Sequence, residues 1–343
     1  MSRSNGWATD RARLLDTWLQ GVLNTRAYSR GEPIADASFR RYFRIKTTQT
    51  SYIVMDAPDQ RQALENFIRI ASELGRIDVP VPVIHAAERN QGFLLLSDLG
   101  DYSYCDVLDA SNADSLYRGA LEKLIRIQTR ACPHGLPDYD TDFFYREMEL
   151  FIDWFLARHL GIELNSADRE IFEEAFTLLI DEALSQPRCF VHRDYHSRNL
   201  MFLSQADPGI LDFQDAVYGP VTYDVVSLLR DVYKTWPPAK IRMWALFYFD
   251  SALEQRVFQN ISDKQFLRWF DLMGVQRHLK IPGIFSRLYY RDGKPGYLKY
   301  IPAALEYLSH VTEKHPELER LHRLLEDMQL GLRTVHCTRE VAQ

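Results

Sequence analysis

The hydrophobic pattern of the chain changes once, close to residue 100, and this change restricts the fold more than any other feature. Before it, short β-branched and aromatic runs predict strands, with a helix ahead of them at 8–24 and one among them at 60–77. After it, helical spacing of apolar residues dominates, at 111–131, 142–160, 167–185 and from about 222 onward. The sequence therefore predicts an α+β protein of two lobes. Residues 1–100 would form a small antiparallel sheet with one helix, and residues 101–343 a larger, mostly helical lobe.

The length and composition fit such a protein. A chain of 343 residues can bury a core in each of two lobes. No apolar run approaches the ~20 residues of a membrane span. A net charge of −6, with 41 basic residues spread along the chain, offers no general attraction for nucleic acid. The start, MSRSNGWATDRARLL, lacks a secretory apolar core, and the four cysteines lack metal-site spacing. We expect a cytoplasmic monomer with reduced thiols and no membrane or nucleic-acid partner.

Residues 190–202, FVHRDYHSRNLMF, place an aspartate and an asparagine just beyond a short apolar run. Transfer of a phosphoryl group from ATP needs a carboxylate that accepts the acceptor's proton, and divalent ions held by hard oxygen ligands. Asp194 suits the first role and Asn199 the second. Thirteen residues later, GILDFQD ends an apolar run at Asp212, which suits a second metal ligand. This is the kinase pattern H-R-D-x-x-x-x-N followed by D-F, and it predicts an enzyme that uses ATP and Mg²⁺.

Asp and Asn are also common in turns, where their side chains bond to nearby backbone. Two features favour the catalytic interpretation. The spacing from Asp194 through Asn199 to Asp212 is that of kinases. Short strands are also predicted before both parts of the motif, separated by a hairpin-sized gap that contains Ser204, Asp207, Pro208 and Gly209.

These motifs resemble those of the kinase-like aminoglycoside phosphotransferases, and the resemblance covers nearly the whole chain. DASFRRYFRI is similar to their phosphate-covering loop, and LLLSDLG to the hinge between their lobes. More narrowly, VHRDYHSRNLM with ILDFQDAVYGPVTYDVVSLLRD resembles the bacterial kinases of cell-wall recycling that phosphorylate the anomeric hydroxyl of N-acetylmuramate and N-acetylglucosamine. The resemblance implies a bilobal protein-kinase-like fold and a sugar 1-phosphate product. Kinases of aminoglycosides, choline or other small molecules are the alternatives within the superfamily.

The resemblance also implies roles for residues around the motifs. The hinge would contact the nucleotide at Ser97, Asp98 and Leu99. Asp224 would anchor the catalytic loop through backbone hydrogen bonds, a role compatible with a carboxylate at a helix start. We expect Arg193 to be a structural ligand of nearby backbone or carboxylate groups rather than a catalyst.

The lysine that binds the α- and β-phosphates in protein kinases is missing. If YIVMD is the third strand, Met55 takes its position. There is no G-x-G-x-x-G either, so phosphate contacts from the loop would come from backbone amides and Ser38. The nearest cations lie on the neighbouring strand, and bidentate contacts from Arg40, Arg41 or Arg44 would replace the lysine. A solvated strand face is the alternative interpretation of these arginines.

The acceptor is expected to lie over Asp194, beside His196 and Arg198. The aromatic-rich segment 143–155 would contribute further contacts, with Tyr145 the first candidate. Arg198 is also a candidate to meet a lactyl carboxylate. A polycationic aminoglycoside would instead need an acidic pocket, for which the chain offers Glu147, Glu149, Asp153 and Asp215.

Two other classes of protein remain to be weighed. A protein kinase would need a long peptide-docking segment after Asp212, but a helix is predicted from about Thr222. A catalytically inactive binding module is supported only by the missing lysine. All small-molecule kinases of this kind use the same three site residues, so the sequence leaves the acceptor open.

Overall fold

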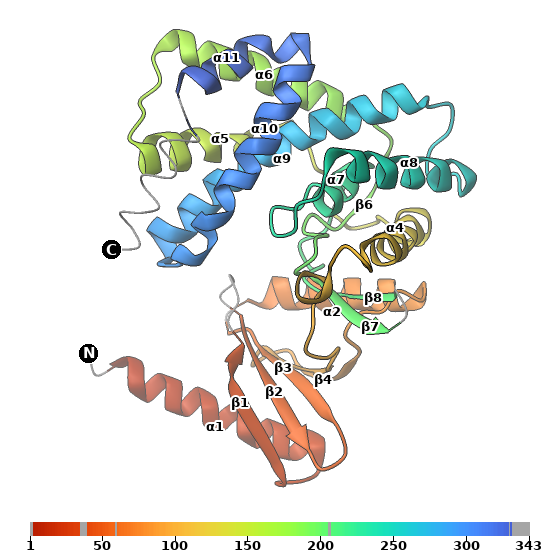
Figure 1. The fold of residues 1–343 in the computed structure, drawn as a ribbon. Helices are drawn as coiled ribbons and strands as arrows, with labels where there is room; N and C mark the ends of the chain where they lie inside the picture. The colour runs from red at the N-terminus through yellow and green to blue at the C-terminus, as the bar shows by residue number, and fades with distance from the viewer. Residues whose placement is uncertain (1–2, 35–39, 59, 205–206, 329, 331–343) are drawn as a thin grey trace.

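The computed structural model describes residues 3–34, 40–58, 60–204, 207–328 and 330. Figure 1 shows two parts, a sheet-based lobe at the N-terminal end of the chain and a larger helical lobe. The last strand of the sheet ends at Ser97 and the next helix begins at Tyr104, so we place the boundary between the lobes in residues 98–103. Within the described ranges, no helix is both long and apolar enough to cross a membrane.

The N-terminal lobe is an antiparallel sheet with the strand order β1-β2-β3-β5-β4. Its strands are β1 (Tyr28–Ile34), β2 (Arg41–Thr47), β3 (Ser51–Asp56), β4 (Ile84–Glu88) and β5 (Phe93–Ser97). The turn predicted near residues 47–51 is confirmed, and the hydroxyl of Thr47 accepts hydrogen bonds there from the amides of Gln49 and Thr50.

Both faces of the sheet are apolar, and each is covered by one helix. On one face, α1 (Arg3–Leu23) packs Leu15 and Leu19 against Val54, Phe93 and Leu95. On the other, α2 (Arg61–Arg76) shares a buried cluster with Met55, Leu94 and Leu96. Successive side chains of a strand point to opposite faces of the sheet, so neighbouring residues of β3 and β5 pack against different helices. The helices predicted at 8–24 and 60–77 are α1 and α2, and both pack on the sheet, whereas the sequence analysis described this lobe as a sheet with one helix.

The helical lobe matches the helical stretches predicted between residues 111 and 185, which become α4, α5 with η1, and α6. The Asp140 side chain caps α5 by accepting a hydrogen bond from the amide of Phe143, and the Asn165 side chain caps α6 by accepting one from the amide of Asp168. The elements are α3 (Tyr104–Val107), α4 (Ala113–Arg130), α5 (Thr141–Leu150), the π-helix η1 (Phe151–His159), α6 (Ser166–Leu184), α7 (Tyr223–Leu229), α8 (Pro238–Glu254), α9 (Asp263–Asp292), η2 (Pro295–Tyr300), α10 (Ile301–Lys314), η3 (Pro316–Leu318) and α11 (Glu319–Asp327).

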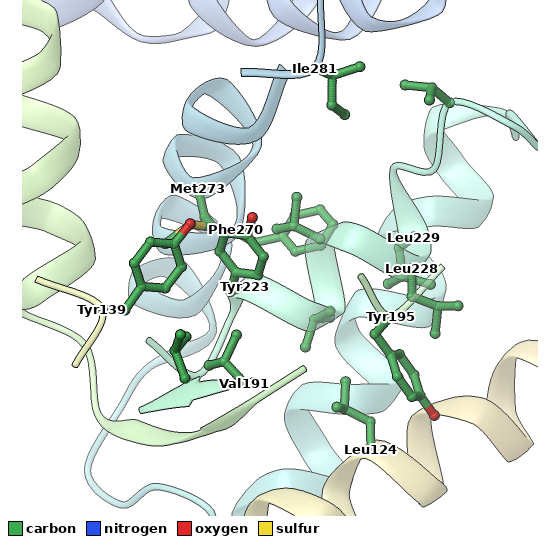
Figure 2. Packing of buried hydrophobic residues seen from close by; sticks show 14 of the residues in the cluster. Leu124, Tyr139, Val191, Tyr195, Tyr223, Leu228, Leu229, Phe270, Met273 and Ile281 are labelled. Atoms are coloured by element: carbon green, nitrogen blue, oxygen red, sulfur yellow. The ribbon is translucent and has the colours of Figure 1, made fainter. Parts of the chain in front are cut away.

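The long helix α9 is the centre of this lobe and contacts α5, η1, α6, α7 and α10. Figure 2 shows Phe270 and Met273 of α9 beside Tyr223 at the start of α7. A Cβ atom at Gly283 would lie 2.2 Å from the backbone oxygen of Leu150, so only glycine allows α9 to cross the end of α5 this closely. The position of α9 is thereby fixed against the α5–η1 segment.

Two short antiparallel pairs of strands carry the motif residues. These pairs are β6 (Arg188–Val191) with β9 (Val217–Pro220), and β7 (Leu200–Ser204) with β8 (Asp207–Ile210). The first loop (192–199) joins β6 to β7, and the second loop (211–216) joins β8 to β9. Strand β8 already includes Asp207, Pro208 and Gly209, which the sequence analysis placed in the turn, and it ends two residues before Asp212. The amide of Ile210 in β8 donates to the Pro80 carbonyl of the N-terminal lobe at 2.7 Å, so this pair of strands, green in Figure 1, lies where the two lobes meet.

Candidate active site

The first loop is held by two buried carboxylates, one at each end of α7. Asp224 accepts hydrogen bonds of 2.6 and 2.9 Å from the amides of His192 and Arg193. Asp231 accepts one of 3.0 Å from the amide of Ser197 and another from its hydroxyl. Asp224 thus makes the backbone contacts that the family resemblance implies, while Asp231 was not identified from the sequence. Together they fix the loop on both sides of its central aspartate.

Arg193 is a structural residue of the same loop. Its φ of +77° is rare for a side chain of this size and is maintained by surrounding bonds. The guanidinium donates to Glu147 at 2.9 Å and to the carbonyl of Asp215 at 3.3 Å. Arg277 of α9 donates to the Arg193 carbonyl at 3.0 Å. These contacts match the expected role as a ligand of backbone and carboxylate groups.

The Asp194 carboxylate lies in a cleft between the two lobes. Burial alone would raise its pKa, but nearby positive charge, led by Lys280, holds the pKa of Asp194 well below its ordinary value. Lys280 and Arg277 belong to α9 and are only 3% and 5% exposed. Asp194 is therefore ionised at neutral pH and able to accept a proton.

Asn199 and Asp212 lie side by side across the start of the β7–β8 pair, because the amide of Leu211 donates to the Asn199 carbonyl at 2.9 Å. The Asn199 Nδ2 atom donates to the Asp194 carbonyl at 2.9 Å, so the amide oxygen is the atom left for a cation. In the described parts of the chain, no three His, Cys, Asp or Glu side chains gather into a metal site. A carboxylate with one amide oxygen instead fits Mg²⁺, which commonly takes one or two protein ligands together with substrate phosphates and water.

The second loop connects Asp212 to the N-terminal lobe. Asp212 has φ of +63° and accepts a hydrogen bond of 2.7 Å from Gln214 Nε2. Phe213 packs on Phe67 of α2, with 4.8 Å between the ring centroids. Arg40, just before β2, places Nη2 4.0 Å from the Asp212 carboxylate. The carboxylate thus faces a cation from the sheet lobe, and α2 packs against the loop that carries it.

The hinge forms the nucleotide end of the cleft. Both polar groups of Ser97 hydrogen-bond to the backbone of Val83. The Ser97 amide donates to the Val83 carbonyl at 2.9 Å, and the Ser97 hydroxyl accepts a hydrogen bond of 2.8 Å from the Val83 amide. Asp98 and Leu99 line the cleft directly. Arg44 also lines it, with Nε 2.7 Å from the Asp98 carboxylate. We infer that Arg44 organises the hinge, at a distance from the phosphate end.

The remaining candidates for phosphate binding lie at different places on the N-terminal sheet. Arg41 points to the α1 side of the sheet, where Nη2 lies 2.6 Å from the buried carboxylate of Asp56, so it does not line the cleft. Met55 is 1% exposed between the sheet and α2 and supplies no charge at the lysine position. Ser38 lies outside the described residues. Arg40 does not line the cavity either, but its Nη2 atom lies 4.0 Å from the Asp212 carboxylate, so it is left as the arginine nearest the expected metal and phosphates.

We predict that Arg40→Ala raises the KM for ATP ~10- to 100-fold, the range expected for loss of a charge-assisted hydrogen bond. Arg41→Ala is the matched control on the opposite face and should leave the KM for ATP near the wild-type value. Steady-state kinetics at saturating acceptor, with thermal melting of each variant, separate binding from folding. Equal effects of the two substitutions would show that Arg40 makes no special phosphate contact.

The acceptor end of the cleft is built from the first loop, the segment after α7, α9 and η2, within a cavity of about 800 Å³. His196 and Arg198 both line it, as expected. The ring of His196 packs edge-on against Tyr233, and the Arg198 guanidinium lies over the same tyrosine ring at 4.6 Å. Tyr145 does not line the cavity; its hydroxyl donates to Glu173 at 2.7 Å on α6.

The acidic residues considered for a polycationic acceptor do not form a pocket. Glu147 is buried, and burial, which alone would raise its pKa, is outweighed by Lys280 and Arg193, which lower that pKa to about 2. Glu149 pairs with Arg169 at 2.7 Å. None of the four candidate carboxylates, Glu147, Glu149, Asp153 and Asp215, lines the cavity.

The sequence analysis missed the contribution of α9. Basic residues of this helix line the cavity at helical spacing, namely Arg277, Lys280, Arg287 and Arg291. Their i, i+3, i+10 and i+14 positions return to one face of a helix with 3.6 residues per turn. That periodic row is visible in RHLKIPGIFSRLYYR, but only the fold shows that it lines the same cavity as the first loop.

Comparison with known families and sequences gives matches over most of the chain. Residues 30–257 match the model of a phosphotransferase enzyme family. The chain is 43% identical over 333 residues to an N-acetylmuramate/N-acetylglucosamine kinase of Pseudomonas putida, covering 94% of this chain and 98% of that protein. It is 46% identical over 297 residues to the protein of the same name from Pseudomonas aeruginosa, covering 87% and 88% of the two chains.

Solved structures with the same fold are more distant in sequence. An ADP-bound aminoglycoside phosphotransferase, APH(2'')-Ib, superposes with a TM-score of 0.59 at 14% identity and covers 86% of this chain and 97% of its own. The choline kinase LicA of Streptococcus pneumoniae gives a TM-score of 0.59 at 11% identity, with 87% and 99% covered. These similarities establish the kinase-like fold that the sequence predicted.

Proposed function

The chain belongs to the phosphotransferase enzyme family and is a kinase, and from this premise we propose that it phosphorylates the anomeric hydroxyl of N-acetylmuramate and N-acetylglucosamine. The observation that carries the choice of acceptor is the charge of the cavity. Four basic residues of α9 and Arg198 line its acceptor end, and none of the four acidic candidates for a polycation site lines the cavity. The six aspartates that do line it include the proposed base Asp194 and the proposed metal ligand Asp212. Such an end suits a neutral or anionic sugar and disfavours a polycation. The relatives at 43% and 46% identity are named N-acetylmuramate/N-acetylglucosamine kinases, which supports the choice of sugars.

In the proposed reaction, Asp194 receives the proton of the acceptor hydroxyl while the hydroxyl oxygen forms a bond to the γ-phosphorus of ATP. The bond from that phosphorus to the β,γ-bridging oxygen breaks, and ADP leaves. Lys280 and Arg277 keep Asp194 ionised before the transfer. The hydrogen bonds from the first loop to Asp224 and Asp231 keep its backbone in place. Asp98 and Leu99 would contact the nucleotide base at the other end of the cleft.

We propose Mg²⁺ as the metal, held by Asn199 and Asp212 together with nucleotide phosphates. Bound there, it would neutralise the charge of the β- and γ-phosphates. A sugar 1-phosphate is an acid-labile product suited to nucleotide-sugar synthesis, which fits a role in peptidoglycan recycling. The reaction would take place in the cytoplasm, where ATP is available, and we expect the enzyme to act as a monomer.

We predict that methyl N-acetylglucosaminide is not phosphorylated, whereas free N-acetylglucosamine is. The methyl group blocks the anomeric oxygen and leaves the primary hydroxyl free, so the comparison identifies the reacting oxygen. ADP release with each sugar, and phosphorus NMR of the product, measure the outcome. Efficient turnover of the methyl glycoside would overturn the anomeric assignment.

A screen of N-acetylmuramate, N-acetylglucosamine, an aminoglycoside, choline and homoserine with Mg·ATP tests the acceptor class. We expect turnover with the two N-acetyl amino sugars alone. Turnover of the aminoglycoside or of choline in their place would leave the phosphotransferase family assignment standing and refute the proposed acceptor.

A further inference from the structure

One basic residue of α9 differs from its neighbours in having no acceptor for its hydrogen bonds. Arg277 donates to the Arg193 carbonyl and the Tyr223 hydroxyl, Lys280 donates to Glu147, and Arg291 pairs with Asp292 at 2.8 Å. For Arg287, the described residues provide no hydrogen-bond or ion-pair partner, and its Nε atom is buried without one. A half-buried guanidinium in this state is costly unless an anion arrives.

The charges around Arg287 also indicate that its guanidinium lacks a neutralising partner among the described residues. Burial lowers its pKa, and the positive charge of Arg291, one turn further along α9, lowers that pKa as well. The negative charges that oppose this effect, Asp292 and Glu147, are the smaller causes, and each already pairs with another cation. The wall of the cavity therefore carries positive charge that no neighbouring carboxylate neutralises at Arg287.

We propose that Arg287 binds the carboxylate of the lactyl group of N-acetylmuramate, and that it is the residue by which the enzyme favours this sugar over N-acetylglucosamine. The inference rests on the proposed function. A guanidinium suits the task because its fork can meet both oxygens of a carboxylate at once.

The position of Arg287 fits this substrate. Arg287 is seven positions after Lys280, so it lies ~10 Å further along the helix axis than the cation whose charge lowers the pKa of Asp194. A sugar whose anomeric hydroxyl meets Asp194 would extend along this wall, with its C3 substituent directed away from the reacting oxygen. Ile284 and Leu288 line the cavity beside Arg287 and offer an apolar surface to the lactyl methyl group.

The other arginines at this end are less suited to the carboxylate. Arg198 lies over the rings of Tyr233, Tyr297 and Tyr300, at 4.6, 5.7 and 5.9 Å, and so serves as part of the wall. Arg291 is exposed and already paired. The lactyl contact considered for Arg198 in the sequence analysis therefore moves to Arg287 in this proposal.

The test compares kcat/KM for N-acetylmuramate, its carboxyl methyl ester and N-acetylglucosamine. Arg287→Ala should lower kcat/KM for N-acetylmuramate ~10- to 100-fold, with a much smaller change for N-acetylglucosamine, which has no carboxylate. Wild-type enzyme should lose a similar factor on the methyl ester, while Arg287→Ala should not distinguish the ester from the acid. Arg287→Lys, which keeps the charge but not the fork, should give an intermediate loss.

Arg291→Ala is the matched control, with the same loss of charge on the same helix, and should preserve the preference for N-acetylmuramate. Arg198→Ala should affect both sugars alike. Three results would each overturn the inference: equal losses on both sugars in Arg287→Ala, the same selective loss in Arg291→Ala, or a selective loss in Arg198→Ala alone. Wild-type turnover of N-acetylglucosamine without N-acetylmuramate would also overturn it, whereas turnover of neither sugar would refute the proposed function itself.

Discussion

Replacing Asp194 by asparagine is expected to lower kcat ~10²- to 10⁴-fold, the usual contribution of general-base assistance. Asparagine has almost the same shape but cannot accept the proton of the acceptor hydroxyl. The hydrogen bonds that Asp194 makes within the first loop use its backbone, since its carbonyl accepts from Asn199 and from the amide of His196. The loop should therefore keep its structure, and the loss should appear in turnover and leave nucleotide affinity unchanged.

The measurement is single-turnover and steady-state ADP release, with nucleotide binding and thermal melting recorded on the same preparations. Asp142→Asn is the matched control, because this exposed residue in the first turn of α5 carries the same charge and lies outside the cleft. Turnover near the wild-type rate in Asp194→Asn would remove Asp194 from the role of base.

Asp212→Ala is expected to reduce Mg²⁺-dependent turnover by ~10³-fold or more, since metal charge stabilisation is worth several kcal/mol. The variant removes the only carboxylate among the two ligands proposed, so the affinity for the ion should fall as well. Asn199→Ala should have a smaller effect, because it removes a neutral amide oxygen.

Titration of activity against Mg²⁺, and of Mn²⁺ binding by electron paramagnetic resonance, measures the loss directly. Asp215→Ala separates two explanations, because Asp215 also lies near Arg40, at 3.7 Å, but is not a proposed metal ligand. If Asp215→Ala proved as damaging as Asp212→Ala, the contact with Arg40 would explain the loss better than the metal.

The fold followed from the sequence because local patterns and the architecture agree. The continuous apolar run FLLLS forms β5, and the helical spacing of 60–77 forms α2. What the pattern could not give was the packing of α1, whose apolar residues are compatible with several partners. Only the second apolar face of the sheet, made by Val54, Phe93 and Leu95, determines where that helix lies.

The candidate site was predictable where residues close in sequence act together. Asp194, Asn199 and Asp212 belong to one short motif, and the structure gathers them in one cleft. The basic residues of the acceptor end that come from α9 lie more than sixty positions after Asp212, so only tertiary packing brings Lys280 close enough to lower the pKa of Asp194. Tertiary packing also explains why Arg41 does not face the cleft. Its neighbour Asp56 on β3, fixed by strand register, turns the guanidinium to the α1 face.

The continuity of the cleft has a consequence for inhibitor design. One cavity runs from Leu99 at the hinge, past Asp194, to Arg287. A single molecule that joins an adenosine to an amino sugar could occupy both ends, and tethering the two groups would convert the second binding event into an intramolecular one. A carboxylate on that molecule, directed at Arg287, would favour this enzyme over kinases with an uncharged acceptor site.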